Sequence, residues 1–240
     1  MLNLERQEAL RERYKQEHPL YLTSRDIYEE LLVRYVNSDS RVLDTGCGQA
    51  GIVEQVMPIV KQAVGIDQTF GDYRETIKLR DLVQGKLEAL PFSPDSFDVI
   101  SCTWVLEHLK NPKRVFREFA RVLCPDGILL FLAPNAHNYV TLMSRSVPNW
   151  LHELMIHALY NRDRGFTFPV YYRANTKSVL DDSLGRLNFV CECFQYVGDP
   201  TYIAFNEPLY RLGVALERLT DFQRTRQLKV HFVAAYRYRG

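Results

Sequence analysis

The stretch "VLDTGCGQAG", residues Val42 to Gly51, decides the fold of this chain. It opens on apolar residues after a polar segment, and it contains the spacing Gly46-x-Gly48-x-x-Gly51. Glycines at this spacing let the backbone turn tightly after a strand and approach a ligand closely. The same stretch contains Asp44, an acid that the dinucleotide-binding pattern does not require. It therefore predicts a ligand-binding loop after a first strand, and Asp44 bears on the choice of ligand.

Short apolar strands alternate with helical segments on both sides of this loop. The predicted strands cover residues 41–45, 62–67, 81–85, 97–102 and 127–134. The predicted helices lie near residues 50–57, 73–80, 104–109 and 112–123. Such alternation predicts an α/β fold with a parallel sheet that is covered by helices on both faces.

The two ends of the chain extend this pattern. Two helices are expected in the first forty residues, the second capped by Thr23 or Ser24. Its apolar face is expected to hold Ile27, Leu31, Leu32 and Tyr35. Near the other end we expect a helix from Asn175 or Thr176, a strand at 190–197, a helix at 207–220 and a last strand at 229–238.

We predict one domain in four parts. They are an N-terminal helical cap (1–38), a cofactor-binding core (39–134), a lid insert (135–174) and the C-terminal part of the sheet (175–240). The lid insert is proposed because the strand–helix rhythm stops after Pro134, where aromatic residues and histidines become frequent. It follows the fifth strand, on the side where open α/β sheets bind ligands.

Composition excludes several classes of protein. The 240 residues include 30 Lys and Arg against 29 Asp and Glu, so the net charge of +1 gives no sign of a nucleic-acid partner. No apolar run is long enough for a membrane span, and the charged N-terminus does not read as a signal peptide. The 5 cysteines lack the spacing of a zinc site or a redox pair, so we expect no metal and a cytoplasmic protein with reduced thiols.

The residues alone leave two cofactors open. Asp67 lies about twenty residues after the glycine loop, where an acid binds a ribose both in dinucleotide-binding folds and in others. Asp44 favours a different ligand from NAD, because a carboxylate would repel a pyrophosphate. A ligand with an ammonium group, a sulfonium and no phosphate makes the same acid useful.

The segments "VLDTGCGQAG", "VGIDQT" and "LEALPFSPDSFDVISCTWVLEHLKNPKRVFREFARVLCPDGILLFLAPN" together resemble the class I S-adenosylmethionine-dependent methyltransferases. The resemblance is to the type 11 branch, which includes ubiquinone/menaquinone C-methyltransferase-like enzymes, and it is strong over residues 40–135. It implies a doubly wound, seven-stranded Rossmann-like sheet whose last strand is antiparallel.

The resemblance also implies the cofactor contacts of S-adenosyl-L-methionine. The residues concerned are Asp44, Gly46, Gly48, Asp67, Gln68, Leu87, Glu88, Ser101 and Thr103. One departure stands out: where relatives often read Gly-Asp-Ala, this chain reads Gly85-Lys86-Leu87. A protonated lysine only donates hydrogen bonds, so Lys86 is not expected to accept one from the adenine amino group.

The acceptor side is predicted with less support from motifs. His137 is the candidate general base because it comes soonest after the strand end, and methyl transfer itself needs no enzyme nucleophile. The residues expected to enclose the acceptor are Tyr14, Tyr21, Trp104, Trp150, His152 and Tyr171. We expect structural roles for Glu107-His108, and packing roles for Cys47 and Cys102.

The predicted function is methyl transfer from S-adenosylmethionine to the O, N or C atom of a small-molecule acceptor, by a monomer or homodimer. The leucines at 209, 212, 216 and 219 are expected to pack on the domain, with a dimer contact or a substrate tunnel as the alternative. Rival functions are an inactive cofactor-binding assembly partner and an NAD-dependent oxidoreductase. A nucleic-acid or protein methyltransferase is a further rival, but "SCTWVLEH" lacks the Asn/Asp-Pro-Pro-aromatic signature of those enzymes.

Overall fold

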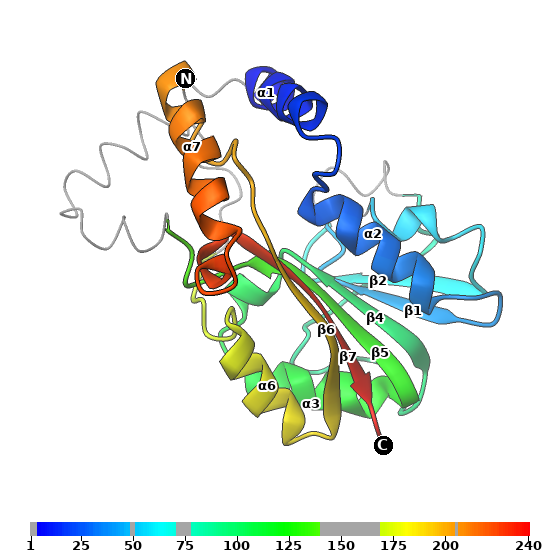
Figure 1. The fold of residues 1–240 in the computed structure, drawn as a ribbon. Coiled ribbons are helices and arrows are strands. Elements are labelled where there is room, and N and C mark those ends of the chain that lie inside the picture. Colours follow the sequence, from blue (N-terminus) through cyan, green and yellow to red (C-terminus); the bar gives the residue numbers. More distant parts are fainter. Residues whose placement is uncertain (1–3, 49–50, 71–77, 140–168, 205) are drawn as a thin grey trace. The chain divides into compact units, whose positions relative to one another are not determined.

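The computed structural model describes residues 4–48, 51–70, 78–139, 169–204 and 206–240 (Figure 1). These residues form two compact units. One unit draws on Met1–Ser24, Pro134–Pro169 and Tyr196–Phe232, and the other on Arg25–Ala133, Val170–Gln195 and Val233–Gly240. The glycine loop belongs to the second unit, which we call the sheet unit; the first is the helical unit.

A seven-stranded sheet carries the fold, in the order β3-β2-β1-β4-β5-β7-β6. Its strands are β1 (Arg41–Thr45), β2 (Gln62–Asp67), β3 (Asp81–Gln84), β4 (Phe97–Thr103), β5 (Leu123–Pro134), β6 (Phe189–Val197) and β7 (His231–Tyr238). The pairs from β3 to β5 are parallel, and the last strand is antiparallel. The predicted doubly wound α/β sheet is confirmed.

The central strands are buried because apolar residues fill both of their faces. Val42, Leu43 and Ile100 have essentially no exposed surface, and neither do the residues Leu129 to Ala133 of β5. Continuous apolar runs of this kind are typical of parallel strands that are covered on both sides. Figure 1 shows α2 (Ser24–Tyr35) on one face, and α3 (Pro112–Val122) and α6 (Lys177–Gly185) on the other.

Several helix boundaries follow from capping residues. Thr176 caps α6 by accepting a hydrogen bond from the Val179 backbone N–H at 3.4 Å. Asn206 caps α7 (Glu207–Thr220) in the same way, accepting from Leu209 at 2.9 Å. The first backbone N–H groups of a helix have no carbonyl acceptor within the helix, and these two side chains accept hydrogen bonds from them instead. The predicted helix at 207–220 and the start near Thr176 are confirmed. The first helix, α1, spans Leu4–Glu17.

Two predicted helices are wrong in type. In the described residues 51–57 and 104–109, the helical structure is limited to the short 3₁₀ helices η1 (Val53–Gln55) and η3 (Leu106–His108). Pro58 disfavours helical backbone in the residue before it, and Leu109 is extended, so neither turn propagates. Of the predicted helix at 73–80, residues 73–77 lie outside the described residues, and residues 78–80 are not helical.

Three smaller differences concern burial and strand ends. In α2 the buried aromatic residue is Tyr28, while the predicted Tyr35 is partly exposed and bonds to Glu192. Strand β5 starts at Leu123, before the predicted 127, because its pairing with β4 tolerates a register shift between Phe97 and Val99. A third short 3₁₀ helix, η4 (Arg226–Leu228), was not predicted.

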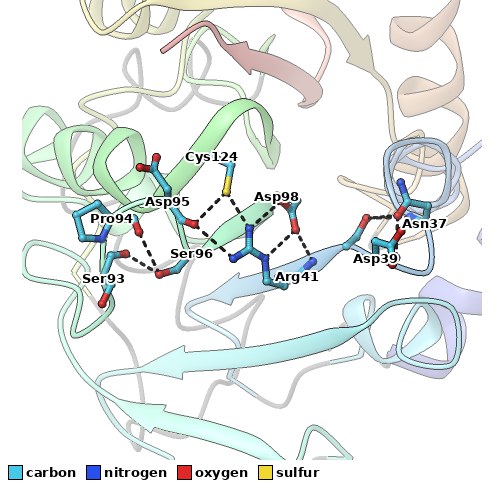
Figure 2. A network of polar contacts seen from close by, with 10 residues as sticks. Asn37, Asp39, Arg41, Ser93, Pro94, Asp95, Ser96, Asp98 and Cys124 are labelled. Atoms are coloured by element: carbon cyan, nitrogen blue, oxygen red, sulfur yellow. Dashed lines mark hydrogen bonds and ion pairs between the residues drawn. The ribbon is translucent and has the colours of Figure 1, made fainter.

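A polar network fixes the start of β1 to its neighbours (Figure 2). The Arg41 guanidinium pairs with Asp98 at 3.1 Å and donates to the Cys124 sulfur at 2.9 Å. Burial acts to raise the pKa of Asp98, but the hydrogen bonds and charge of Arg41 outweigh it and lower that pKa. The network lies at the amino ends of the strands, opposite the glycine loop, so its role is structural.

The helical unit has its own apolar contacts. Tyr14 of α1 packs with Ala204 and with Tyr210 of α7. The helical unit also contains a buried carboxylate, Glu217, which accepts hydrogen bonds from the Asp199 backbone N–H at 3.1 Å and from Lys229 Nζ at 3.2 Å. Among the described residues, none of the helices has both the length and the apolar character that crossing a membrane requires.

Candidate cofactor site

Asp44 and Ser101 face each other at the carboxyl ends of β1 and β4. The two residues are paired in the sheet register, and the Ser101 hydroxyl donates to Asp44 Oδ1 at 3.0 Å. The Tyr28 hydroxyl of α2 donates in turn to Ser101 Oγ at 2.8 Å. All three side chains are buried, with Asp44 4% exposed and the other two fully enclosed. The acid is thus held by a chain of two hydroxyl groups.

Burial dominates the acidity of Asp44. It raises the pKa of this carboxyl to about 7, although the hydrogen bond from Ser101 acts in the opposite direction. The nearby carboxylates Asp67 and Glu54 raise the pKa further. An acid in this state ionises readily when a cationic ligand group arrives, because the opposite charge favours the carboxylate.

The glycine loop is held against β2. The backbone N–H groups of Gly46 and Cys47 both donate to the Ile66 carbonyl, at 2.8 and 3.2 Å. Gly46 has φ of +64°, and a Cβ built on it would lie 2.3 Å from Val105 Cγ2. Gly48 has φ of +48°. Both positions therefore require glycine, for conformation and, at Gly46, also for space.

Asp67 lies at the end of β2, beside the loop. Its Oδ2 accepts from the Gly48 backbone N–H at 2.9 Å, and its Oδ1 accepts from Thr69 at 3.1 Å. These two donors orient the carboxylate while each oxygen keeps a lone pair. Asp67 is half-buried, so part of its side chain or backbone surface remains open beside the loop.

The residues expected beside the adenine follow β2 (Gln68) and β3 (Leu87 and Glu88). Gln68 is exposed, and its carbonyl accepts from the Gln84 side chain at 2.9 Å. Leu87 is buried, Glu88 is half-buried and Lys86 is exposed. A single antiparallel bridge joins Lys86 to Ala89, which makes the segment a tight turn.

The end of β4 has an unusual backbone. Thr103 is half-buried, and Trp104 follows with φ of +57° while its N–H donates to the Leu132 carbonyl at 2.8 Å. A left-handed conformation is costly for a residue with a large side chain, and such strain is concentrated at functional sites. The Trp104 side chain is 41% exposed.

Glu107 lies in η3 just beyond Trp104. Its backbone carbonyl accepts from Tyr171 at 2.7 Å and from Tyr172 at 3.2 Å, so it anchors the chain after the undescribed segment 140–168. Its carboxyl is buried, and burial raises its pKa. Oε2 has no hydrogen-bond partner among the described residues, while Oε1 lies 3.9 Å from His108 Nε2. The backbone contacts agree with the structural role predicted for this dipeptide.

The other predicted site residues belong to different units of the structure. Tyr171 is exposed in the sheet unit, whereas Tyr14, Tyr21 and His137 belong to the helical unit. Tyr21 donates to the Gly198 carbonyl at 3.0 Å, and exposed His137 follows Asn135, whose Oδ1 accepts from its backbone N–H at 3.0 Å. Trp150 and His152 lie outside the described residues.

Two buried cysteines near the loop have packing roles, as predicted. Burial raises the pKa of Cys47 to about 12 and that of Cys102 to about 12, so both are thiols at neutral pH. Cys47 packs over Gly65: a Cβ on that glycine would lie 2.8 Å from the Cys47 sulfur. All 5 cysteines of the chain are free.

The residues at this sheet edge fit S-adenosylmethionine better than a dinucleotide. Two carboxylates, Asp44 and Asp67, flank the loop on adjacent strands. An ammonium group and a pair of ribose hydroxyls complement them, whereas a pyrophosphate would meet like charge. Sequence reasoning missed Tyr28, which supports Asp44. Its position one residue after Ile27, on the helix face that also holds Leu31 and Leu32, was the available signal.

Comparisons with known proteins agree with this geometry. Residues 43–131 match the family model described as a methyltransferase domain. The uncharacterized methyltransferase YcgJ of Bacillus subtilis is 34% identical over 104 residues, which are 40% of this chain and 41% of that protein. The crystal structure of YcgJ superposes on this chain with a TM-score of 0.55 and 18% sequence identity. The superposition covers 89% of this chain and 98% of the YcgJ chain.

One further relative in sequence and one solved structure of similar fold are as follows. The ubiquinone biosynthesis O-methyltransferase of Yersinia enterocolitica is 29% identical over 121 residues, 47% of this chain and 46% of that enzyme. The [4+2]-cyclase SpnF has a TM-score of 0.56 at 17% identity, covering 88% of this chain and 79% of its own. The matched segments thus span less than half the length of the curated relatives.

These findings show what the chain is similar to. Residues 43–131 match a methyltransferase domain model, and the seven-stranded sheet has the Rossmann-like fold of solved methyltransferase structures. Several relatives of similar identity are named S-adenosylmethionine-dependent methyltransferases, so S-adenosylmethionine is the cofactor of this class of domain.

Proposed function

We propose that this protein transfers the methyl group of S-adenosylmethionine to an O, N or C atom of a small-molecule acceptor. The observation that carries the proposal is the pair of carboxylates, Asp44 and Asp67, that flank the glycine loop on adjacent strands. The cofactor, when bound, supplies an activated methyl group on a sulfonium. The protein's task is then to bind, align and desolvate the reactants.

Asp44 is assigned to the ammonium group of the cofactor. Its Oδ1 accepts from Ser101, and no described group donates to Oδ2, which is left for the ligand. Ionised, this buried carboxylate is a strong acceptor for a charge-assisted hydrogen bond. Gly46 and Gly48 let the loop backbone come close to the same end of the ligand.

Asp67 is assigned to the ribose. Two backbone N–H groups already fix its orientation, and its remaining lone pairs suit two adjacent hydroxyls. Gln68 and Leu87, with Glu88, are assigned to the edge and face of the adenine. Lys86 is exposed and is left out of this set.

We propose that the acceptor is a small, apolar molecule and not a nucleic acid. The net charge of +1 argues against a nucleic acid, and Trp104 and Tyr171 offer aromatic surface within the sheet unit. Ser101 is fully buried and already engaged by Tyr28 and Asp44, so half-buried Thr103 is the better candidate for a residue near the methyl group. His137 stays the proposed general base for an acceptor that must lose a proton.

One rival is supported by a specific observation. SpnF shares this fold and is named as a cyclase, so the fold alone does not fix the reaction. A protein that binds the cofactor without transferring its methyl group therefore remains the second candidate.

Calorimetry and turnover separate these candidates. Titration with S-adenosylhomocysteine and with NAD should show binding of the first alone. Radiolabelled S-adenosylmethionine should then give labelled product with some member of a panel of phenols, amines and carboxylic acids. NAD binding without S-adenosylhomocysteine binding would reject the cofactor site, and binding without transfer across a broad panel would favour the second candidate.

A further inference from the structure

The hydrogen-bond chain behind Asp44 does more than pack the core. It begins in α2 at Tyr28, passes through Ser101 of β4 and ends on Oδ1 of Asp44 in β1, with steps of 2.8 and 3.0 Å. Each hydroxyl in it donates toward the carboxyl group. Donation of this kind favours the carboxylate over the acid, and a chain of donors polarises each member.

The surroundings of Asp44 act against ionisation. The groups that face it are the carboxylates Asp67 of β2 and Glu54 of η1, and the thiols Cys47 and Cys102. None of them is a cation. Burial and the two carboxylates therefore oppose the charge that Ser101 and Tyr28 support.

We infer that Tyr28 and Ser101 are positioning residues that set the charge state of Asp44, so that binding of the cofactor's ammonium group expels a proton from Asp44 to the solvent. This inference rests on the proposed assignment of Asp44 to the ammonium group. In this step the O–H bond of the Asp44 carboxyl breaks, the proton goes to the buffer, and the carboxylate pairs with the ammonium group.

Cofactor affinity should depend on pH through the protonation of Asp44. The pKa of Asp44 in the free protein is raised to about 7, and the ligand's cation lowers it in the complex. Below that midpoint, each pH unit should reduce the affinity by about tenfold, because Asp44 must first lose its proton. Well above the midpoint the affinity should be independent of pH.

The experiment titrates the full-length protein with S-adenosylhomocysteine between pH 5.5 and 8.5, in buffers of different ionisation enthalpy. The difference between buffers counts the protons released. The wild type should release a proton below about pH 7 and none at pH 8.5. Asp44→Asn should bind weakly throughout and release none, and any proton that it does release measures the contribution of other groups.

Three variants then test the hydroxyl chain. Ser101→Ala removes the donor to Asp44, so the midpoint should rise and the affinity at pH 7 should fall by about tenfold, recovering at pH 8.5. Tyr28→Phe keeps the ring and should cause a smaller shift in the same direction. Thr45→Val is the matched control, because the Thr45 hydroxyl is equally buried but donates to the Ser101 backbone carbonyl at 2.8 Å. Its midpoint should match the wild type.

The outcomes separate this inference from the proposed site. Unchanged binding by Asp44→Asn would reject the assignment of Asp44 itself. If Asp44→Asn binds weakly but the wild type releases no proton, the inference alone is rejected. The same holds if Ser101→Ala, Tyr28→Phe and Thr45→Val all have the same midpoint. Thermal melts of Tyr28→Phe and Ser101→Ala check that both variants fold, and pH-dependent recovery of affinity is a readout that a folding defect does not produce.

Discussion

The backbone N–H of Gly48 donates to the Asp67 carboxylate at 2.9 Å, which joins the glycine loop to the end of β2. The residue proposed to bind the ribose therefore also orders the loop that approaches the rest of the cofactor. Ligand binding and loop order should fail together when this carboxylate is removed.

Asp67→Ala should weaken S-adenosylhomocysteine binding by about 1.5–3 kcal/mol, the range for a hydrogen bond to a charged group. Calorimetry at pH 8 measures this loss. Asp81→Ala is a suitable control, since Asp81 is an exposed carboxylate at the start of β3. Equal affinities for the two variants would contradict the ribose assignment.

Lys86→Ala should leave cofactor affinity nearly unchanged. The lysine side chain is exposed, and its ammonium group cannot accept a hydrogen bond from the adenine amino group. The same calorimetric titration tests this. A loss of about tenfold or more, equivalent to about 1.4 kcal/mol, would show that Lys86 contacts the ligand.

Asp44→Asn should stabilise the ligand-free protein at pH 8. The folded-state pKa of Asp44 is raised from 3.8 to about 7, so its stabilising contribution is complete below pH 3.8 and is lost as the pH rises through about 7. Removing the charge should recover about 1–4 kcal/mol at pH 8 and little at about pH 4, where the carboxyl is largely protonated in both the folded and the unfolded protein. Denaturant melts at both pH values measure the difference. A variant less stable than the wild type at pH 8 would mean that the buried carboxylate is compensated in the folded protein.

Gly46→Ala should lower both stability and cofactor affinity. The added methyl group meets Val105 in a backbone conformation that disfavours alanine, so we expect a loss of about 1–3 kcal/mol in the free energy of unfolding. Gly185→Ala provides the comparison, because a Cβ there has no neighbour within 4 Å. Similar melting temperatures for the two variants would contradict the steric argument.

His137→Ala should reduce turnover without weakening cofactor binding. The imidazole is exposed and its proposed role concerns only the acceptor's proton. Single-turnover rates with the acceptor found in the panel measure the effect, and His18→Ala controls for loss of a partly exposed histidine elsewhere in the helical unit. Unchanged turnover would remove His137 from the catalytic set.

Sequence patterns predicted the elements with strong periodicity. Strand β2 was predicted at 62–67 and α7 at 207–220, which match Gln62–Asp67 and Glu207–Thr220. Both have clear limits: β2 ends at an acid before a polar loop, and α7 starts after a capping asparagine. The cofactor loop was predicted from glycine spacing, and the positive φ angles of Gly46 and Gly48 explain why that spacing is informative.

The contacts within the site and the lengths of the short turns depend on tertiary structure, which local sequence patterns do not record. Periodicity placed Tyr28 near the buried face of α2, but its bond to Ser101 depends on how that helix crosses β4, which no local pattern records. The sequence predicts that Ser101 contacts the cofactor, and its enclosure between Tyr28 and Asp44 depends on tertiary packing that the sequence pattern does not record. The short turns η1 and η3 look helical in composition, and only the prolines and extended residues around them limit their length.

The exposed indole of Trp104 makes the end of β4 observable by optical spectroscopy. The chain has 2 tryptophans, and the indole of Trp104 is 41% exposed at the carboxyl end of that strand. A Trp150→Phe variant would therefore leave Trp104 as the single tryptophan, and excitation at the red edge of the indole absorption would avoid the 14 tyrosines. Its emission would report in real time when ligands arrive at this end of the sheet and when they leave.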